Sequence, residues 1–109
     1  MRAANDAAAS RETGINIMEI RLTSQFKKDI KKLKSSPKGK AVEDILKTQV
    51  FPNLLSGKEL PEKFKDHALI GDWIPSRECH IYPDTLLIYR IEFDTLIFVR
   101  LGSHSALFG

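Results

Sequence analysis

All three histidines of this 109-residue chain lie in its C-terminal part, close in sequence to arginines and carboxylates. Histidine takes up and releases protons near neutral pH, and arginine binds phosphate oxygens through its planar fork. We therefore expect one site that transfers protons beside an anionic substrate. The candidate residues are His67, His80, Asp84, Arg100 and His104.

Cleavage of RNA by its own 2′-hydroxyl group needs proton-transfer groups and a cation of this kind, and it needs no cofactor. A base removes the 2′ proton, the oxygen attacks the adjacent phosphate, an acid protonates the departing 5′ oxygen, and a cation stabilises the phosphate charge. Other chemistries fit less well. The sequence has no Gly-rich loop followed by lysine, and Ser103 and Ser105 have no nucleophile elbow around them.

A metal site is the alternative interpretation, because the potential ligands are His67, Cys79, His80, Asp84 and His104. No two of them lie at a usual ligand spacing. Adjacent Cys79 and His80 would also point to opposite faces of a strand. We therefore expect neither a metal nor a cofactor. Each histidine could instead be a hydrogen-bonded structural residue, although three close together weaken that interpretation.

Three strands are expected to carry most of these side chains. Segments 77–82, 86–91 and 95–101 are rich in β-branched, aromatic and leucine residues and are separated by turn signals. Residues two apart on a strand point the same way. Arg100, Gly102 and His104 should therefore share one face of the sheet. If His80 on the neighbouring strand points to the same face, Glu78 and Tyr82 line that face as well. His67 would approach from the loop between Pro61 and Pro75.

A short strand and two helices precede this region. Met18, Ile20 and Leu22 alternate as in a strand, and Phe26, Ile30 and Leu33 recur as in a helix that begins at Thr23 or Ser24. Segment 35–39 breaks that helix. Val42, Ile45 and Leu46 mark a second helix, which Pro52 should kink or end. The prediction is an α+β fold of order β-α-α-β-β-β, with a two-helix hairpin on one face of a small antiparallel sheet.

Charge and composition limit the classes of partner. The chain carries a net charge of +3, but segment 21–40 has eight basic residues against Asp29 alone. This local patch indicates an anionic partner, or else a solvated helix face. No apolar run is long enough to cross a membrane. The single Cys79 cannot form an internal disulfide, which fits a reducing compartment, and we expect a cytoplasmic protein.

Residues 1–16 are small and polar and have no hydrophobic signal-peptide core. We expect them to be a disordered extension or sequence foreign to the native product, since Met18 could be a start codon. The single folded domain is then 17–109.

Several separated motifs resemble the YafQ-like toxins of the RelE/ParE superfamily. They are Lys65 to Leu69, Gly71-Asp72-Trp73, Arg77 to Ile81, Pro83-Asp84, Leu87-Ile88-Tyr89 and Arg100 to Gly109, and the similarity extends from Met18 onward. The resemblance implies a RelE-like fold and a bacterial type II toxin. Such a toxin is an endoribonuclease that cuts mRNA in the ribosomal A site and is neutralised by a cognate antitoxin.

The resemblance also implies roles for individual residues. The functional positions of the family fall on His67, His80, Asp84, Arg100, His104 and Phe108. His67 would be the general base and His104 the general acid, or the reverse, with Arg100 on the scissile phosphate. His80 and Asp84 would position groups or the RNA, and Phe108 would stack on a base or orient the nucleotide. The protein for which the family is named has tryptophan after the aspartate of the Pro-Asp pair, where this chain has Thr85.

The basic patch acquires a role from the same resemblance, because it would contact the phosphates of ribosomal RNA or else the antitoxin. The residues assigned to RNA binding are Lys27, Lys28, Lys31, Lys32, Lys34 and Arg77. Two alternatives remain open. One is a non-enzymatic gyrase poison of the ParE type, and the other is a basic module that binds protein or RNA and whose histidines are structural.

Overall fold

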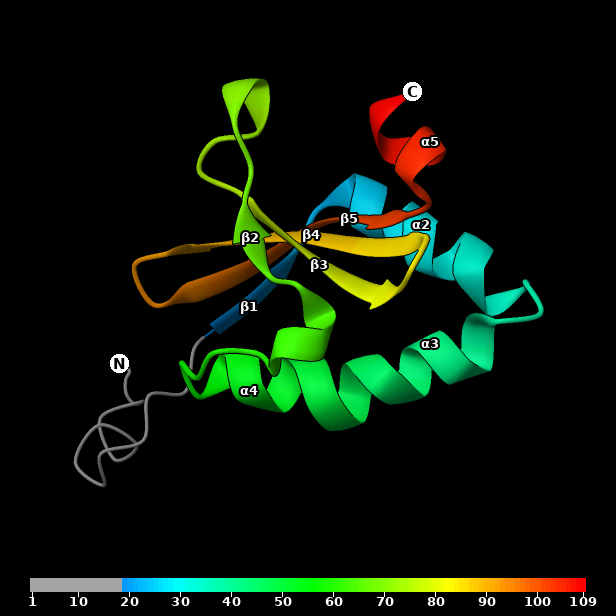
Figure 1. Ribbon diagram of the computed structural model, residues 1–109, viewed down its shortest axis with the longest axis horizontal. Coiled ribbons are helices and arrows are strands. Elements are labelled where there is room, and N and C mark those ends of the chain that lie inside the picture. Colours follow the sequence, from blue (N-terminus) through cyan, green and yellow to red (C-terminus); the bar gives the residue numbers. More distant parts are fainter. Residues whose placement is uncertain (1–18) are drawn as a thin grey trace.

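The computed structural model describes residues 19–109, so the expectations for residues 1–16 lie outside the described part of the chain. A sheet runs through the centre, with helices α3 and α4 below it and helix α5 above it (Figure 1). The elements are β1 (Glu19–Leu22), α2 (Ser24–Lys34), α3 (Gly39–Ile45), α4 (Phe51–Leu55), β2 (His67–Ala68), β3 (Arg77–Tyr82), β4 (Thr85–Glu92), β5 (Thr95–Gly102) and α5 (His104–Phe108). No helix within 19–109 is long and apolar enough to cross a membrane.

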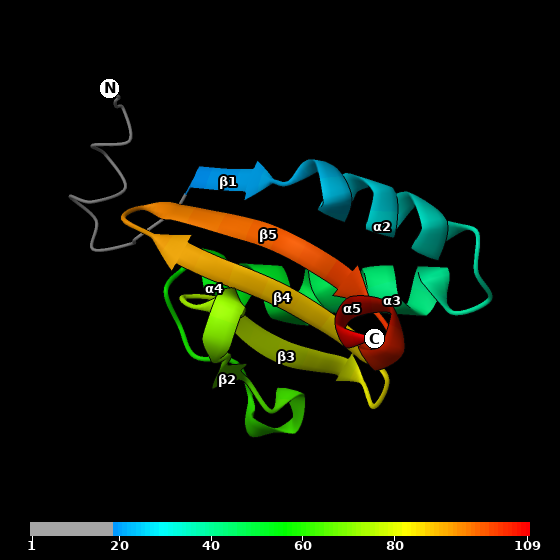
Figure 2. The same cartoon turned by 90° about the horizontal axis from the view of Figure 1, so that it is seen from above.

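The sheet has five strands in the order β1-β5-β4-β3-β2, which can be followed in the view from above (Figure 2). Strands β2 to β5 pair antiparallel with their neighbours, whereas β1 pairs parallel with β5. The predicted α+β order is confirmed. Two details differ from the prediction: β1 pairs parallel in a sheet that is otherwise antiparallel as predicted, and the long loop contains a two-residue strand, β2.

Helices α2, α3 and α4 cover one face of the sheet and form the main core with it. Phe26 of α2, a helix that begins at the predicted N-cap Thr23, lies with its ring centroid 5.4 Å from that of Phe98 on β5. Phe51 at the start of α4 lies tilted against the same ring, with 4.6 Å between the centroids. Phe98 is 1% exposed, so burial of this one side chain joins β5 to both helical segments. The predicted helices are therefore confirmed.

Pro52 does not end the second helical segment. The chain continues from α3 through a π-helical turn, Leu46–Val50, directly into α4. The amide of Phe51 donates to the carbonyl oxygen of Leu46, the wider spacing of a π turn. Proline cannot donate a backbone hydrogen bond and its ring crowds the preceding turn, so the widened turn lets the helix pass Pro52.

The opposite face of the sheet carries two rows of residues from three strands. Glu78, Ile88 and Arg100 are successive cross-strand partners, as are His80, Leu86 and Gly102. Directly opposed residues share a face, so the predicted grouping of Arg100 and Gly102 with Glu78 and His80 is confirmed.

Tyr82 is an exception to the predicted alternation. The strand pairing of β3 shifts between His80 and Tyr82, and Tyr82 packs against the helical core instead of lining the opposite face. A shift of one residue in strand pairing reverses the face to which a side chain points.

The outer edge of β5 is completed by helix α2. Strand β1 pairs with β5 only as far as Phe98. Beyond that point the Thr23 hydroxyl donates to the carbonyl oxygen of Val99, and the amide of Leu101 donates to the Asp29 carboxylate at 2.9 Å. The same carboxylate accepts hydrogen bonds from Arg100 Nε and Nη2 at 2.8 and 3.2 Å. Asp29 thus replaces a neighbouring strand for this part of β5.

Asp29→Asn should destabilise the chain by about 2 kcal/mol, because it leaves the charge of Arg100 without its partner. Burial raises the pKa of Asp29, but the hydrogen bonds from Arg100 and Leu101 and the charge of Arg100 outweigh it and lower the pKa overall. This stabilisation is therefore present above the ordinary aspartate pKa and is lost as the pH falls through the lowered folded-state value. Urea unfolding from pH 7 to pH 3 should show a weaker acid dependence in Asp29→Asn than in the wild type.

Asp44→Asn is the matched control, since Asp44 lies on the exposed side of α3. Equal stability losses in the two variants would contradict the assigned role of Asp29.

Candidate active site

A carboxylate lies between two histidines on the sheet face opposite α3 and α4. The Oε1 atom of Glu78 is 3.4 Å from Nε2 of His67 and 3.3 Å from Nε2 of His80. The two ring centroids are 6.1 Å apart. The side chain of Glu78 is 7% exposed, whereas that of His67 is 51% exposed. A buried negative charge thus faces two rings that can become positively charged, one of them open to solvent.

The orientation of His67 is set by the chain just before it. Lys65 adopts a left-handed conformation, with φ of 50°, at the end of a 3₁₀ turn. Its carbonyl oxygen lies 2.7 Å from Nδ1 of His67. Because a carbonyl oxygen only accepts hydrogen bonds, Nδ1 carries the proton, and in the neutral ring Nε2 keeps its lone pair. The nitrogen beside Glu78 can therefore act as a base.

Arg100 lies on the same face and is held by Asp29. The hydrogen bonds to Asp29 use Nε and Nη2, so Nη1 stays available to a phosphate oxygen. The hydrogen bond to Asp29 raises the pKa of Arg100, and its burial lowers the pKa by less. The guanidinium group is thus permanently charged and fixed in direction.

The chain after β5 forms a short helix, α5 (His104–Phe108), so His104 does not continue the strand face of Arg100 and Gly102 as predicted. Ser103 caps this helix through its hydroxyl, which accepts from the amide of Ala106. The Asp84 carboxylate, in the turn between β3 and β4, accepts from the amide of His104 at 3.0 Å. Two cap residues therefore fix the position of His104 although its side chain is exposed.

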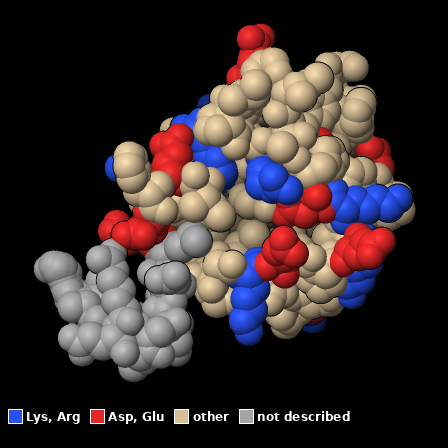
Figure 3. Space-filling model, turned by 60° about the vertical axis from the view of Figure 1, so that its left-hand side comes forward, with Lys and Arg blue, Asp and Glu red and all other residues tan. Residues whose placement is uncertain are grey.

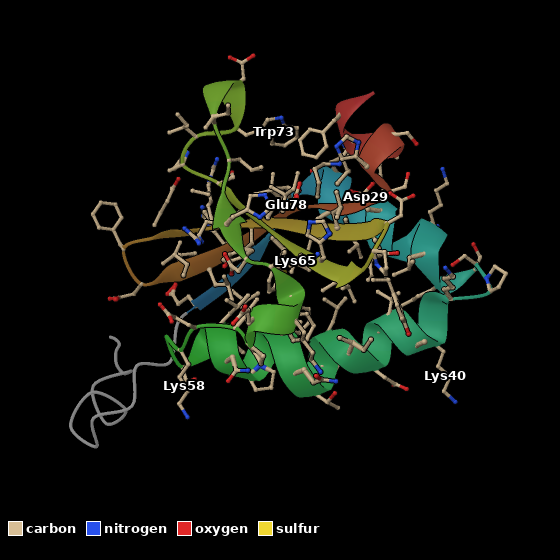
Figure 4. All side chains as sticks on the ribbon, in the orientation of Figure 1. Asp29, Lys40, Lys58, Lys65, Trp73 and Glu78 are labelled. Atoms are coloured by element: carbon tan, nitrogen blue, oxygen red, sulfur yellow. The ribbon has the colours of Figure 1, made fainter. Side chains whose placement is uncertain are left out.

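An aromatic group stands beside His104. The ring centroid of Phe108, one turn further along α5, is 5.1 Å from that of His104. Trp73, in the loop before β3, meets Phe108 edge-on at 5.3 Å. Figure 4 shows Trp73 extending from its loop toward α5, above the strand that carries Glu78. Loop and helix thus form an aromatic wall over the sheet.

The predicted RNA-binding residues do not all lie together. The five lysines of α2 are exposed, and one of them, Lys34, pairs with Glu43 at 3.5 Å. Arg77 neighbours Glu78 on β3 and therefore points to the helical face, where its Nε donates to Asp66 at 2.7 Å. The Asp66 carboxylate also accepts from the Tyr89 hydroxyl. Arg77 is thus separated from the histidines by the sheet.

A second group of lysines lies closer to the histidines. Lys63, Lys65 and His80 line a groove of about 300 Å³ together with Tyr82 and Pro83. The face in Figure 3, by contrast, shows acidic and basic side chains mixed over its surface. The groove therefore supplies positive charge next to the candidate catalytic groups.

Three residues of this site were not among the predicted site residues, although each has an identifiable partner. Glu78 shares its face with His80, a relation that strand alternation reveals, but its contact with His67 depends on the fold. Asp29 is the one acid in the basic segment, and its partner Arg100 is 71 positions away. Trp73 lies in a motif noted in the sequence, yet nothing local indicates that it meets Phe108.

Cys79 is excluded from the site, as expected from strand alternation. It is buried on the helical side, and burial strongly raises the pKa of its thiol, which therefore stays protonated. The potential metal-binding group within 19–109 contains Glu78, with His67 and His80, in place of the cysteine considered in the sequence analysis.

Comparison with known proteins identifies the family. The sequence model of the family described as the bacterial toxin of type II toxin–antitoxin systems, YafQ, matches residues 18–109 of this chain. The mRNA interferase toxin YafQ of Escherichia coli K12 is 37% identical over 91 residues, which cover 84% of this chain and 96% of that protein. The chain belongs to the YafQ family of type II toxins.

Solved structures agree with this assignment. The toxin in the E. coli DinJ–YafQ complex is 37% identical with a TM-score of 0.71, and the alignment covers 84% of this chain and 99% of the other. A metal-bound toxin from Helicobacter pylori is 40% identical with a TM-score of 0.70, covering 84% of this chain and all of the other. The five-stranded fold is therefore that of solved family members.

Trp73 is the only tryptophan of the chain, so its fluorescence reports the docking of α5. Asp84→Ala removes one of the two caps of α5 and should cost about 1 kcal/mol of local stability. Because the Phe108 contact then loosens, we expect red-shifted emission and greater quenching of Trp73 by acrylamide. Asp44→Ala is the control, and identical quenching in both variants would contradict the capping role of Asp84.

Proposed function

We propose that this chain is a ribosome-dependent endoribonuclease that cleaves mRNA through attack of the 2′-hydroxyl group. Its similarity to a toxin named as an mRNA interferase supports the substrate. The observation that carries the proposal is the environment of His67. Its Nδ1 is held by the Lys65 carbonyl oxygen and its Nε2 lies beside a buried carboxylate. That arrangement suits a neutral base that must become positively charged.

His67 acts as the general base in this mechanism. Its Nε2 takes the proton of the 2′-hydroxyl group, and the oxygen attacks the adjacent phosphorus. The resulting imidazolium is stabilised by the Lys65 carbonyl oxygen on one side and the Glu78 carboxylate on the other. The aspartate of a Ser-His-Asp catalytic triad stabilises its imidazolium in the same way. His80, also beside Glu78, contributes a second ring near the phosphate.

His104 acts as the general acid and Arg100 binds the phosphate. The protonated His104 donates to the departing 5′ oxygen, so the P–O bond breaks without an alkoxide being released. Nη1 of Arg100 stabilises the charge on the non-bridging oxygens. Asp84 serves this step indirectly, since its hydrogen bond to the amide of His104 keeps that residue at the start of α5.

The aromatic wall of Trp73 and Phe108 binds a nucleobase beside the cleaved bond. Phe108 is half-buried and already in contact with His104, so a base stacked on it places its ribose or phosphate near the acid. Trp73 enlarges this stacking surface. It supplies an aromatic group to a chain that has Thr85 where the protein for which the family is named has tryptophan. Codon preference would then depend on the loop that carries Trp73.

The proposed partners follow from the family and from charge. A relative is crystallised with its antitoxin, DinJ, and we propose a cognate antitoxin for this chain. The exposed lysines of α2 bind the phosphates of ribosomal RNA, which keeps the toxin in the A site of cytoplasmic ribosomes. The lysine groove beside His80 binds the mRNA backbone.

Loss of either proton-transfer group should lower cleavage by about 10²–10⁴-fold. Purified His67→Ala and His104→Ala chains would be added to translating extracts, and the 5′ ends of the mRNA mapped. The wild type should cut at a fixed codon position, only when ribosomes are present. Lys58→Ala, an exposed change in the loop after α4 and outside the basic patch, should cleave normally.

Full toxicity of both histidine variants would overturn the proposal. DNA damage signalling without mRNA cleavage would point to a gyrase poison instead. Tight partner binding with all three histidines replaced, and no cleavage by the wild type, would identify a binding module.

Charge reversal on α2 should weaken binding to ribosomes without altering the catalytic groups. Each lysine that contacts one phosphate contributes about 1 to the slope of log affinity against log salt. Lys28→Glu and Lys31→Glu should therefore flatten the salt dependence of co-sedimentation with ribosomes. Lys58→Glu, exposed in the loop after α4, is the charge-matched control, and equal slopes in all three variants would refute ribosome contact through α2.

A further inference from the structure

The proposed base, His67, lies on the shortest strand of the sheet. Strand β2 consists of His67 and Ala68, and both residues are exposed. It lies at the edge of the sheet and pairs with β3. So short an exposed strand does not by itself hold a side chain within the narrow tolerance that proton transfer needs. Contacts outside β2 must therefore fix the direction of His67.

One of these contacts comes from a carbonyl group on a strained residue. The carbonyl oxygen of Lys65 accepts from Nδ1 of His67 at 2.7 Å. Lys65 follows the 3₁₀ turn Glu62–Phe64 and has φ of 50° and ψ of 43°, in the left-handed region. This conformation costs free energy for a residue with a side chain, and it persists where the surrounding structure holds it. Figure 4 shows Lys65 where the chain passes from the helices to β2.

The next residue, Asp66, provides a fixed point for this segment. Its side chain is 16% exposed. Its Oδ1 accepts from Nε of Arg77 at 2.7 Å, and its Oδ2 accepts from the Tyr89 hydroxyl. Arg77 and Tyr89 are cross-strand partners on β3 and β4. The two carboxylate oxygens of Asp66 thus tie the chain just before β2 to two strands of the sheet.

Both donors to Asp66 keep their protons at neutral pH. The hydrogen bond to Asp66 raises the pKa of Arg77, and burial lowers that pKa by less. Burial, followed by the hydrogen bond to Asp66, strongly raises the pKa of Tyr89. Tyr89 is also 2% exposed, so water has little access to its hydroxyl group. The two hydrogen bonds are therefore permanent contacts of the folded chain near pH 7.

A rigid peptide unit links Asp66 to the carbonyl group that orients His67. The Lys65 carbonyl and the Asp66 amide belong to one planar group that ends at the Cα atom of Asp66. Holding Asp66 on the helical side of the sheet limits the rotation of this plane, and with it the direction of the carbonyl oxygen. His67 meanwhile faces Glu78 on the opposite side.

We propose that Asp66, held by Arg77 and Tyr89, is a positioning residue for catalysis. It orients the Lys65 carbonyl oxygen and so keeps the ring proton of His67 on Nδ1 and the lone pair on Nε2. Its effect on cleavage rests on the proposed function, whereas the tautomer of His67 is a property of the chain itself. Arg77, which the sequence predicted to bind RNA, acts here from the far side of the sheet through Asp66.

Ring-nitrogen NMR of the purified chain tests the orientation directly, at a pH where the His67 ring is neutral. In the wild type, Nδ1 should carry the proton, and a proton on Nε2 would overturn the proposal without any variant. Asp66→Asn and Tyr89→Phe each remove one of the two hydrogen bonds. Both should produce a mixture of the two tautomers.

Asp44→Asn, an exposed change on α3, is the matched control and should keep the wild-type tautomer. Amide spectra would show that each variant folds, and either anchor variant suffices for the test. A folded Asp66→Asn or Tyr89→Phe chain with the wild-type tautomer would contradict the role of Asp66.

Cleavage on ribosomes that carry a defined mRNA separates positioning from a general loss of stability. Asp66→Asn should lower kcat by about 10²-fold with little change in KM, because the base is misdirected while the lysines of α2 are unaltered. Added to His67→Ala, the same change should have no further effect, since Asp66 acts through His67. An additive loss in the double variant would sink the proposal. Asp44→Asn should cleave as the wild type does.

The two measurements distinguish this proposal from the proposed function. A wild-type chain that never cleaves mRNA, but whose His67 tautomer changes in the anchor variants, would refute the proposed function and leave the orienting role of Asp66 standing. Wild-type cleavage by both anchor variants, with His67→Ala inactive, would refute the positioning role and leave the proposed function standing.

Discussion

The position of β5 inside the sheet, between β1 and β4, is the constraint on which most of this structure depends. An interior strand must satisfy its backbone groups on both edges. One edge of β5 pairs with β4 along the whole strand, but β1 reaches only to Phe98. Helix α2 completes the other edge with Thr23 and Asp29. The unpaired backbone groups of β5 thus hold α2 in place, and the Asp29 carboxylate that pairs with them also holds Arg100.

The secondary structure was largely predictable because local patterns determine it. Runs of β-branched, aromatic and leucine residues between turn signals identified β3 to β5. Apolar spacing after a cap at Thr23 or Ser24 identified α2. Features that depend on distant partners were not predictable. Strand β2 exists because His67 and Ala68 meet β3, and α5 is a helix because Ser103 and Asp84 cap five residues too few to be stable alone. The π turn before Pro52 likewise requires a core that holds the helix on both sides of it.

The catalytic groups of the candidate site could be predicted from the sequence, but most of the residues that position them could not. Residue types alone indicated the histidines and Arg100, since few side chains transfer protons or bind phosphate at neutral pH. Their supporting residues, Asp29, Glu78 and the Lys65 carbonyl, act through contacts made by the fold. Arg77 illustrates the converse. It lies beside Glu78 in sequence, but strand alternation turns it to the other face, where the hydrogen bond to Asp66 raises its pKa and holds it.

Carboxylates in a site for RNA raise an electrostatic question, because each would repel a phosphate. Here each carboxylate is compensated by the group that it positions. Asp29 accepts three hydrogen bonds from Arg100 and the Leu101 amide, and Asp84 accepts the amide of His104. Glu78 lies between two imidazoles. The substrate therefore meets the outer groups, namely the guanidinium, the rings and the lysine groove. The site gains fixed directions for its catalytic groups without presenting negative charge to RNA.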